Sequence, residues 1–378
     1  MAKDVSSYLS EQQRRSTGDV SQEWTQIEEF YNKKLWHQLT LKLLEFVKHS
    51  SFAQGDGLIK MYHNFMVDFE HRINPLALME ICVYVAKQIK DPKEAVEFLE
   101  KLKDKVKGSE EAAILCLTII GNIQLDQKEF DATKLIITEA EQKLESMDKV
   151  TSVHGRFYNL ASNFHKLMSH HADYYRDALR YLGCTDLADI PSAEQVERAF
   201  NLGLAAILGK GIYNFGELLA HPILESLKDT ERSWLVDLLF AFNSGSIARF
   251  EALKAQWSTQ PDLTSQELQM RQKISLLCLM EMTFKRPSTD RQLTFNEIAQ
   301  ETQLPLDEVE LLVMKALCLG LVKGSIDQVE QKVHMTWVQP RVLDKEQIGT
   351  MQEKLKAWCA EVSEMENLVE IKAHDILT

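Results

Sequence analysis

Apolar residues recur at helical spacing along almost the whole chain before residue 320, and this periodicity limits the possible fold more than any other feature. The segment from Leu58 to Phe69, for example, places its bulky side chains on one stripe of a helix with 3.6 residues per turn. No comparable alternation of apolar and polar residues, which would indicate strands, occurs before residue 320. The 378 residues include only 15 glycines and 8 prolines, which leaves room for long uninterrupted helices. The sequence therefore predicts a mainly α fold.

The helices are expected to come in pairs. The first helices of successive pairs should begin near residues 22, 56, 92 and 128. This spacing matches the period of tetratricopeptide-like (TPR-like) helix pairs, although the consensus residues of that repeat are absent. We expect residues 1–20 to form a flexible tail and residues 21–171 to form a helical-pair solenoid. Stacked helix pairs produce a long curved surface suited to holding other proteins.

A different pattern begins near residue 291. Thr294 and Glu297 form a capping box that opens a short helix, and a second helix should end at Gly320. Two strand-like runs follow, the second of which alternates its apolar side chains. Two helices and a hairpin predict a winged helix at about residues 291–340. We expect three side chains on one face of the hairpin to form a contact surface: Val333, Met335 and Trp337.

Winged helices often bind DNA, but the charges here argue against that function. The second helix carries Asp307, Glu308 and Glu310 against a single lysine, Lys315. The chain as a whole has a formal charge of −13. Binding to phosphates requires lysine and arginine side chains, and base recognition depends on that binding. We therefore favour a protein-docking role for this module, and a winged-helix nucleic-acid adaptor is the alternative.

The last segment, residues 345–378, is expected to be one long helix with an apolar seam. The seam residues follow one another at alternating steps of three and four: Ile348, Met351, Leu355, Trp358, Val362, Met365 and Val369. Such a repeat buries itself only against another helix. Because tryptophan at such a position fits a symmetric dimer poorly, we favour a bundle of unlike helices. A terminal helix folded back on its own domain is the alternative.

The sequence contains no pattern that indicates catalysis or a cofactor. His170 and His171 would point about 100° apart on a helix, so they are not expected to bind one metal ion. The stretch GLAAILGKG at residues 203–211 lacks the spacing and the Ser or Thr of a phosphate-binding loop. The six cysteines never approach C-x-x-C spacing, so we expect buried, reduced thiols. We therefore expect no catalytic residue, no metal and no cofactor, and a chain that is not an enzyme.

Several runs of sequence resemble a known family. The run from Tyr174 to Gly183, followed by the run from Tyr213 to Leu219, is similar to the helical half of a PCI module. That module is shared by the proteasome lid, the related signalosome and a translation initiation factor. Further runs resemble one particular non-ATPase subunit family of the proteasome lid: residues 35–40, 52–60, 276–284, 324–341 and 373–378. The resemblance covers nearly the whole chain and implies a PCI module at residues 172–340.

The resemblance also implies a function. It implies a structural lid subunit, without peptidase, deubiquitinase or ATPase activity, that acts in ubiquitin-dependent protein degradation. In that family the winged-helix halves pack side by side, and the C-terminal helices gather into a bundle. The implied partners are other lid subunits of the PCI and MPN types in a hetero-oligomer, with the ubiquitin-receptor subunit as a further candidate.

Other partners and locations can be weighed from the sequence. We expect neither nucleic acid nor a membrane as a partner, because the chain is acidic and no apolar run approaches the roughly 20 residues of a bilayer span. The use of cysteine fits a reducing compartment, so we expect a cytoplasmic and nuclear location. A subunit of the signalosome or of an initiation factor is the alternative from the same module family.

Overall fold

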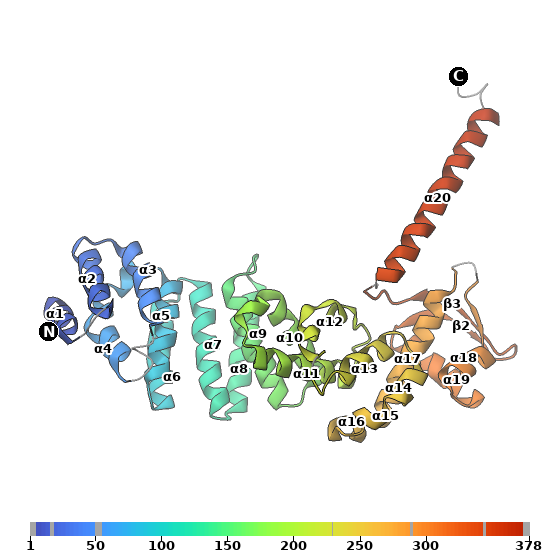
Figure 1. Cartoon of the computed structure of the whole chain (residues 1–378), viewed down its shortest axis with the longest axis horizontal. Coiled ribbons are helices and arrows are strands. Elements are labelled where there is room, and N and C mark those ends of the chain that lie inside the picture. Colours follow the sequence, from blue (N-terminus) through green and yellow to red (C-terminus); the bar gives the residue numbers. More distant parts are fainter. Residues whose placement is uncertain are drawn as a thin grey trace. The chain divides into compact units, whose positions relative to one another are not determined.

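The computed structural model describes residues 5–15, 19–49, 55–228, 230–287, 290–342 and 345–372, and it is helical apart from one small sheet (Figure 1). The mainly α fold predicted from the sequence is confirmed. The chain divides into two compact units, Met1–Asp186 and Leu187–Thr378. This division lies after the boundary at residue 171 that we expected, because α10 (His171–Cys184) packs closely against α9 (Ser152–Leu167).

The first unit is built from helix pairs. Its helices in chain order are α1 (Val5–Arg15), α2 (Asp19–Asn32), α3 (Trp36–Phe46), α4 (Gly57–Asn64), α5 (Pro75–Gln88), α6 (Pro92–Lys105), α7 (Glu110–Asp126), α8 (Phe130–Glu145), α9 and α10, with 3₁₀ turns at Met66–Asp68 and Glu70–Arg72. The first helices of four pairs begin at Asp19, Gly57, Pro92 and Phe130, close to the predicted starts. The prediction of N-terminal helical repeats is therefore confirmed.

The core of the first unit is continuous along the stacked pairs. Helices α3, α5, α7 and α9 contact one another in that order, and α6 and α8 pack against α7. Helix α7 is covered by neighbours on several sides, so it buries both cysteine and aliphatic side chains along most of its length. Aromatic rings fill the N-terminal end of this core, where Trp24 meets Phe46 edge to face with ring centroids 4.7 Å apart.

The expected flexible tail is wrong over the residues that the structure describes there. Residues 5–15 form α1, and α2 already begins at Asp19. Leu9 of α1 is 1% exposed, and the ring of Tyr8 meets Trp24 edge to face at 6.3 Å. Helix α1 thus packs on α2 and covers the apolar end of the first pair.

The second unit combines a helical part, a winged helix and a long terminal helix. Its elements are a 3₁₀ turn at Leu187–Asp189, α11 (Ser192–Leu208), α12 (Gly216–Ala220), a 3₁₀ helix at Pro222–Leu227, α13 (Trp234–Asn243), α14 (Ile247–Ala252), α15 (Lys254–Trp257), α16 (Pro261–Ser265), α17 (Glu267–Lys285), β1 (Gln292–Thr294), α18 (Phe295–Thr302), α19 (Leu306–Cys318), β2 (Val322–Asp327), β3 (Lys332–Val338) and α20 (Lys345–Lys372). Among the described residues, no helix combines the length and the apolar composition needed to cross a bilayer.

The winged helix follows the sequence prediction closely. Thr294 and Glu297 form the predicted capping box at the start of α18. Gly320 has a positive φ of 69° after the end of α19, as a left-handed residue at a helix end requires. The three strands form an antiparallel sheet in the order β1-β3-β2, so β3 is the central strand and β2 lies at an edge. Strand β1, which pairs Leu293 with Val333, was not predicted.

Candidate interaction surfaces

Helix α20 carries the predicted seam on an exposed surface. Every described side chain from Ile348 to Lys372 is exposed. The exposed fractions of the seam residues lie between 46% and 63%: Ile348, Met351, Leu355, Trp358, Val362, Met365 and Val369. The rest of the predicted segment, residues 373–378, lies outside the described residues. An apolar stripe of this length is a candidate site for another helix.

The structure corrects the contact surface that we predicted on the hairpin. Val333 is 0% exposed and Met335 is 1% exposed, because both face inward from the central strand β3. Only Trp337 of the predicted trio remains accessible, at 36%, and the ammonium of Lys323 lies 4.9 Å from the centre of its ring. Strands β1 and β2 are the two edges of the sheet, and among the described residues the outer edge of β2 has no pairing strand, so the six residues of β2 offer an open backbone edge.

Helix α19 has an exposed apolar strip that was not predicted from the sequence. Leu311 is 63% exposed, Met314 is 47% exposed, and Leu319 just beyond the helix is 47% exposed. Glu310 and Asp307 lie on the same helix, and Glu310 accepts a hydrogen bond from Gln328 at 3.1 Å. The buried residues of α19 include Val309, Leu312 and Val313. Leu311 and Met314 lie next to them in the sequence and widen the apolar stripe of the helix beyond its buried face, and this width could have predicted the strip. This surface is apolar and acidic, which suits a protein partner.

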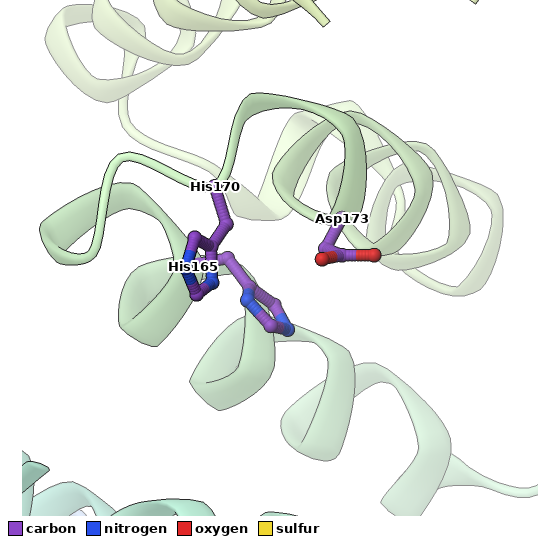
Figure 2. A group of neighbouring side chains, drawn as sticks. All are labelled: His165, His170 and Asp173. Atoms are coloured by element: carbon purple, nitrogen blue, oxygen red, sulfur yellow. The ribbon is translucent and has the colours of Figure 1, made fainter. Parts of the chain in front are cut away.

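The sequence drew attention to the adjacent pair His170 and His171, whereas the structure brings His170 close to His165. Figure 2 shows His165, His170 and Asp173 gathered at the turn between α9 and α10, each with one ligand atom within 4.8 Å of the others. This limit is looser than the roughly 3.4 Å between ligand atoms that zinc bonds of about 2.0–2.2 Å produce. Asp173 is also bound to Arg176 at 3.2 Å. The expectation of a polar helix junction without a metal ion therefore stays a prediction.

The glycine run at residues 203–211 ends beside a buried lysine. Lys273 of α17 is 8% exposed, and its ammonium donates hydrogen bonds to the carbonyl oxygens of Ala206, Ile207 and Gly209 at 2.7–2.9 Å. These carbonyls close the C-terminal end of α11, where the helix offers them no N–H partner. Burial lowers the pKa of Lys273 to about 7, whereas the three acceptors favour its charged form. All three donors of the ammonium are thus used within the protein.

Gly203 has a packing role in the same run. A Cβ atom at Gly203 would lie 2.7 Å from a side-chain carbon of Leu235, so glycine allows α11 and α13 to approach closely. Together with the lysine cap at the end of α11, this contact explains the glycine run by helix packing and helix termination. The cavity of about 400 Å³ that Lys273 lines also borders Lys210 and Lys315.

The cysteines divide evenly between the interior and the surface. Cys82, Cys116 and Cys278 are buried, as expected, whereas Cys184, Cys318 and Cys359 are exposed. Burial raises the pKa of the Cys278 thiol to about 11, which keeps it protonated. The expectation of buried thiols is therefore correct for half of them.

Comparison with known proteins defines the class. One family model, described as PSD13 N-terminal repeats, matches residues 23–239, and a second, described as PCI domain, matches residues 250–337. The first match begins in α2, and the second begins at the C-terminal half of α14 and ends in β3. Helical repeats followed by a winged helix thus define a PCI-domain protein with N-terminal helical repeats.

Individual relatives define the family within this class. The chain is 38% identical over 367 residues to the 26S proteasome non-ATPase regulatory subunit 13 of Dictyostelium discoideum, with 95% of each chain covered. It is 39% identical over 366 residues to homolog A of that subunit from Arabidopsis thaliana, covering 94% of this chain and 95% of the relative. The chain therefore belongs to the 26S proteasome non-ATPase regulatory subunit 13 family. The resemblance of the sequence runs to one subunit family of the proteasome lid is confirmed.

More distant relatives bear on the alternative from the same module family. The COP9 signalosome complex subunit 7 of Dictyostelium discoideum is 25% identical and covers 39% of the chain. The eukaryotic translation initiation factor 3 subunit M of Yarrowia lipolytica is also 25% identical and covers 43% of the chain. Both similarities are lower and shorter than those to subunit 13, so the alternative is not favoured.

Proposed function

We propose that the chain is a non-catalytic structural subunit of the lid of the 26S proteasome regulatory particle, where it acts in ubiquitin-dependent protein degradation by holding other subunits. The observation that carries this proposal is the exposed seam of α20. The identity of its relatives, which are proteasome regulatory subunits, supports the choice of complex. The proposed partners are PCI-type and MPN-type lid subunits in a hetero-oligomer, with the ubiquitin-receptor subunit as a further candidate, and the proposed location is the cytoplasm and nucleus.

The seam supplies a driving force for assembly. Burying an exposed Leu, Ile, Met or Val side chain completely contributes about 1.5–3 kcal/mol. The seven seam residues are about half exposed, so their burial would contribute on the order of 7 kcal/mol in total. Association itself costs roughly 4–15 kcal/mol in lost translational and rotational freedom. The seam alone therefore gives weak binding, and stable incorporation needs a second contact.

The winged helix offers that second contact. The open edge of β2 can accept a strand from a neighbouring subunit, because its outward backbone groups have no strand partner among the described residues. The apolar strip of Leu311, Met314 and Leu319 adds side-chain area on the same module. We propose that PCI modules meet through this surface while the α20 seams join a helix bundle.

The seam proposal is tested by incorporation into the purified complex. Trp358→Asp places a charge in the middle of the seam, where burial without a partner costs several kcal/mol. Ala360→Asp is the matched control, because it adds the same charge two residues away on the opposite face of α20. We expect Trp358→Asp and deletion of residues 345–378 to reduce co-purification with the complex at least tenfold, and Ala360→Asp to reduce it little. Normal incorporation of the truncated chain would contradict the proposal.

A further inference from the structure

Segments that are far apart in the sequence meet where the winged helix ends and α20 is about to begin. The backbone N–H of Gln339 donates to the carbonyl of Leu321 at 2.8 Å, which holds the end of the sheet. The next residues, Pro340–Val342, then lie against the helical part of the second unit. We call these three residues the strap.

Arg341 fixes the middle of the strap. Its guanidinium donates to the carbonyl oxygen of Asn243 at 3.1 Å and pairs with the carboxylate of Glu281. The side chains of Arg341 and Glu281 are only 11% and 10% exposed. Asn243 is the last residue of α13, so its carbonyl has no N–H partner within the helix, and the helix dipole at this end favours a cation. The buried guanidinium is therefore matched by a carboxylate from α17 and by the end of α13.

Val342 fixes the end of the strap. Its backbone N–H donates to the side-chain oxygen of Asn214 at 3.3 Å, and the same oxygen accepts from the N–H of Gly216 at 3.2 Å. A Cβ atom at Gly216 would lie 2.4 Å from the Cβ of Val342. Real side chains do not approach so closely, so glycine at position 216 lets the strap lie against the start of α12.

These contacts limit where α20 can begin. Three residue steps separate Val342 from Lys345, and an extended chain spans at most about 3.6 Å per residue. The start of α20 therefore lies within roughly 11 Å of Val342. If the strap were released, the nearest fixed point would be Gln339, and six residue steps would double this reach.

We propose that Arg341 is a positioning residue that, together with Asn214 and Gly216, fixes the start of α20 so that the seam and the winged-helix surface engage one assembly at the same time. This inference rests on the proposed function. When two binding surfaces are linked, the second contact forms at an effective concentration that falls roughly with the −3/2 power of linker length. Doubling the connection between Val342 and α20 from three to six residue steps therefore lowers this concentration about threefold.

An insertion tests positioning without disturbing any contact of the strap. Gly-Ser-Gly is inserted between Val342 and Lys345, and the same insertion after Lys149, at an exposed turn of the first unit, is the matched control. Each variant is co-expressed with the tagged wild-type chain, and the ratio of the two chains in the purified complex is measured. We expect about threefold under-representation for the insertion at the strap and an equal ratio for the control. Thermal unfolding of the free chains should give the same Tm for both.

Substitutions of Arg341 then test whether the contacts of the strap are responsible for this positioning. Arg341→Gln should lower incorporation at least threefold, and Arg341→Lys, which keeps the charge beside Glu281, should recover part of this loss. An equal ratio for the insertion at the strap would overturn the positioning role. If that result came with a defect on truncation of residues 345–378, the proposed function would stand and this inference alone would fail. If the truncated chain also entered the complex normally, both would fail.

Discussion

Several helix ends in this protein depend on residues other than glycine in the left-handed conformation. Lys34, Lys128, Ser169 and Gln303 have positive φ angles between 53° and 64°. Each is followed by a residue whose N–H reaches back to a carbonyl five positions earlier, as in the 2.9 Å bond from Glu129 to Gln124. This hydrogen bond is that of a Schellman motif, which usually places glycine at the left-handed position. Because these positions carry no glycine, the sequence could give the approximate starts of the helix pairs but not their ends.

His165 gives a pH-dependent prediction at the residue scale. Burial lowers the pKa of His165 despite its neighbours Asp177, at 3.6 Å, and Asp173, while His170 and Arg176 lower it further. When the pH falls below about 6.5, the pKa of a histidine in the unfolded chain, His165 is protonated in the unfolded chain before it is protonated in the folded chain. The stability of the first unit should therefore fall as the pH is lowered from about 6.5 towards the folded pKa of His165.

The measurement is urea unfolding at several pH values between 7 and 5. We expect His165→Gln to lose less stability over this range than the wild-type chain, because the titrating group is gone. His63→Gln replaces an exposed histidine of the same unit and is the control. Equal pH dependence of the wild-type and His165→Gln chains would show that this histidine is not responsible.

At the scale of elements, the sequence predicted the helices and strands of the winged helix better than it predicted which of their side chains are exposed. The capping box, the left-handed glycine and the two long strands all carry strong local signals, and each lies where it was expected. Strand β1 has only three residues, too few to show an alternating pattern. The alternation in β3 correctly grouped Val333 with Met335, but alternation cannot say whether a face meets solvent or the protein's own core. That depends on α17 and on the neighbouring elements, which pack against β3 from elsewhere in the sequence.

The end of α11 gives a prediction at this scale. Lys273→Met keeps most of the buried aliphatic chain but removes three hydrogen bonds to the carbonyls that close the helix. Leaving such buried acceptors unpaired should lower the free energy of unfolding of the second unit by about 3 kcal/mol. Lys210→Met removes an exposed lysine beside the same cavity and should change stability little. Denaturant unfolding of both variants checks this, and similar stabilities would contradict the capping role.

At the scale of the whole molecule, the order of parts was predictable, but the packing differs from the expected organisation at the N-terminal tail and at residue 171. Periodicity and spacing placed helical repeats before a winged helix and a terminal helix, and the structure has this order. The sequence motif around Tyr174 suggested that α10 belongs to the PCI module, whereas packing places it with α9 in the first unit. Leu9 likewise joins the core of the first unit, although the polar residues around it suggested a tail. Both differences arise from tertiary contacts that local sequence does not record.

Other polypeptides are expected to cover the seam of α20 when the whole molecule is assembled. A photo-crosslinking amino acid at position 358, in chains assembled in cells, tests this most directly, with the same group at position 360 as the control on the opposite face. We expect crosslinks from position 358 to join this chain to other lid subunits, and far fewer from position 360. Crosslinks from position 358 that form only within this chain would show that the seam folds back on its own unit, and they would contradict the account.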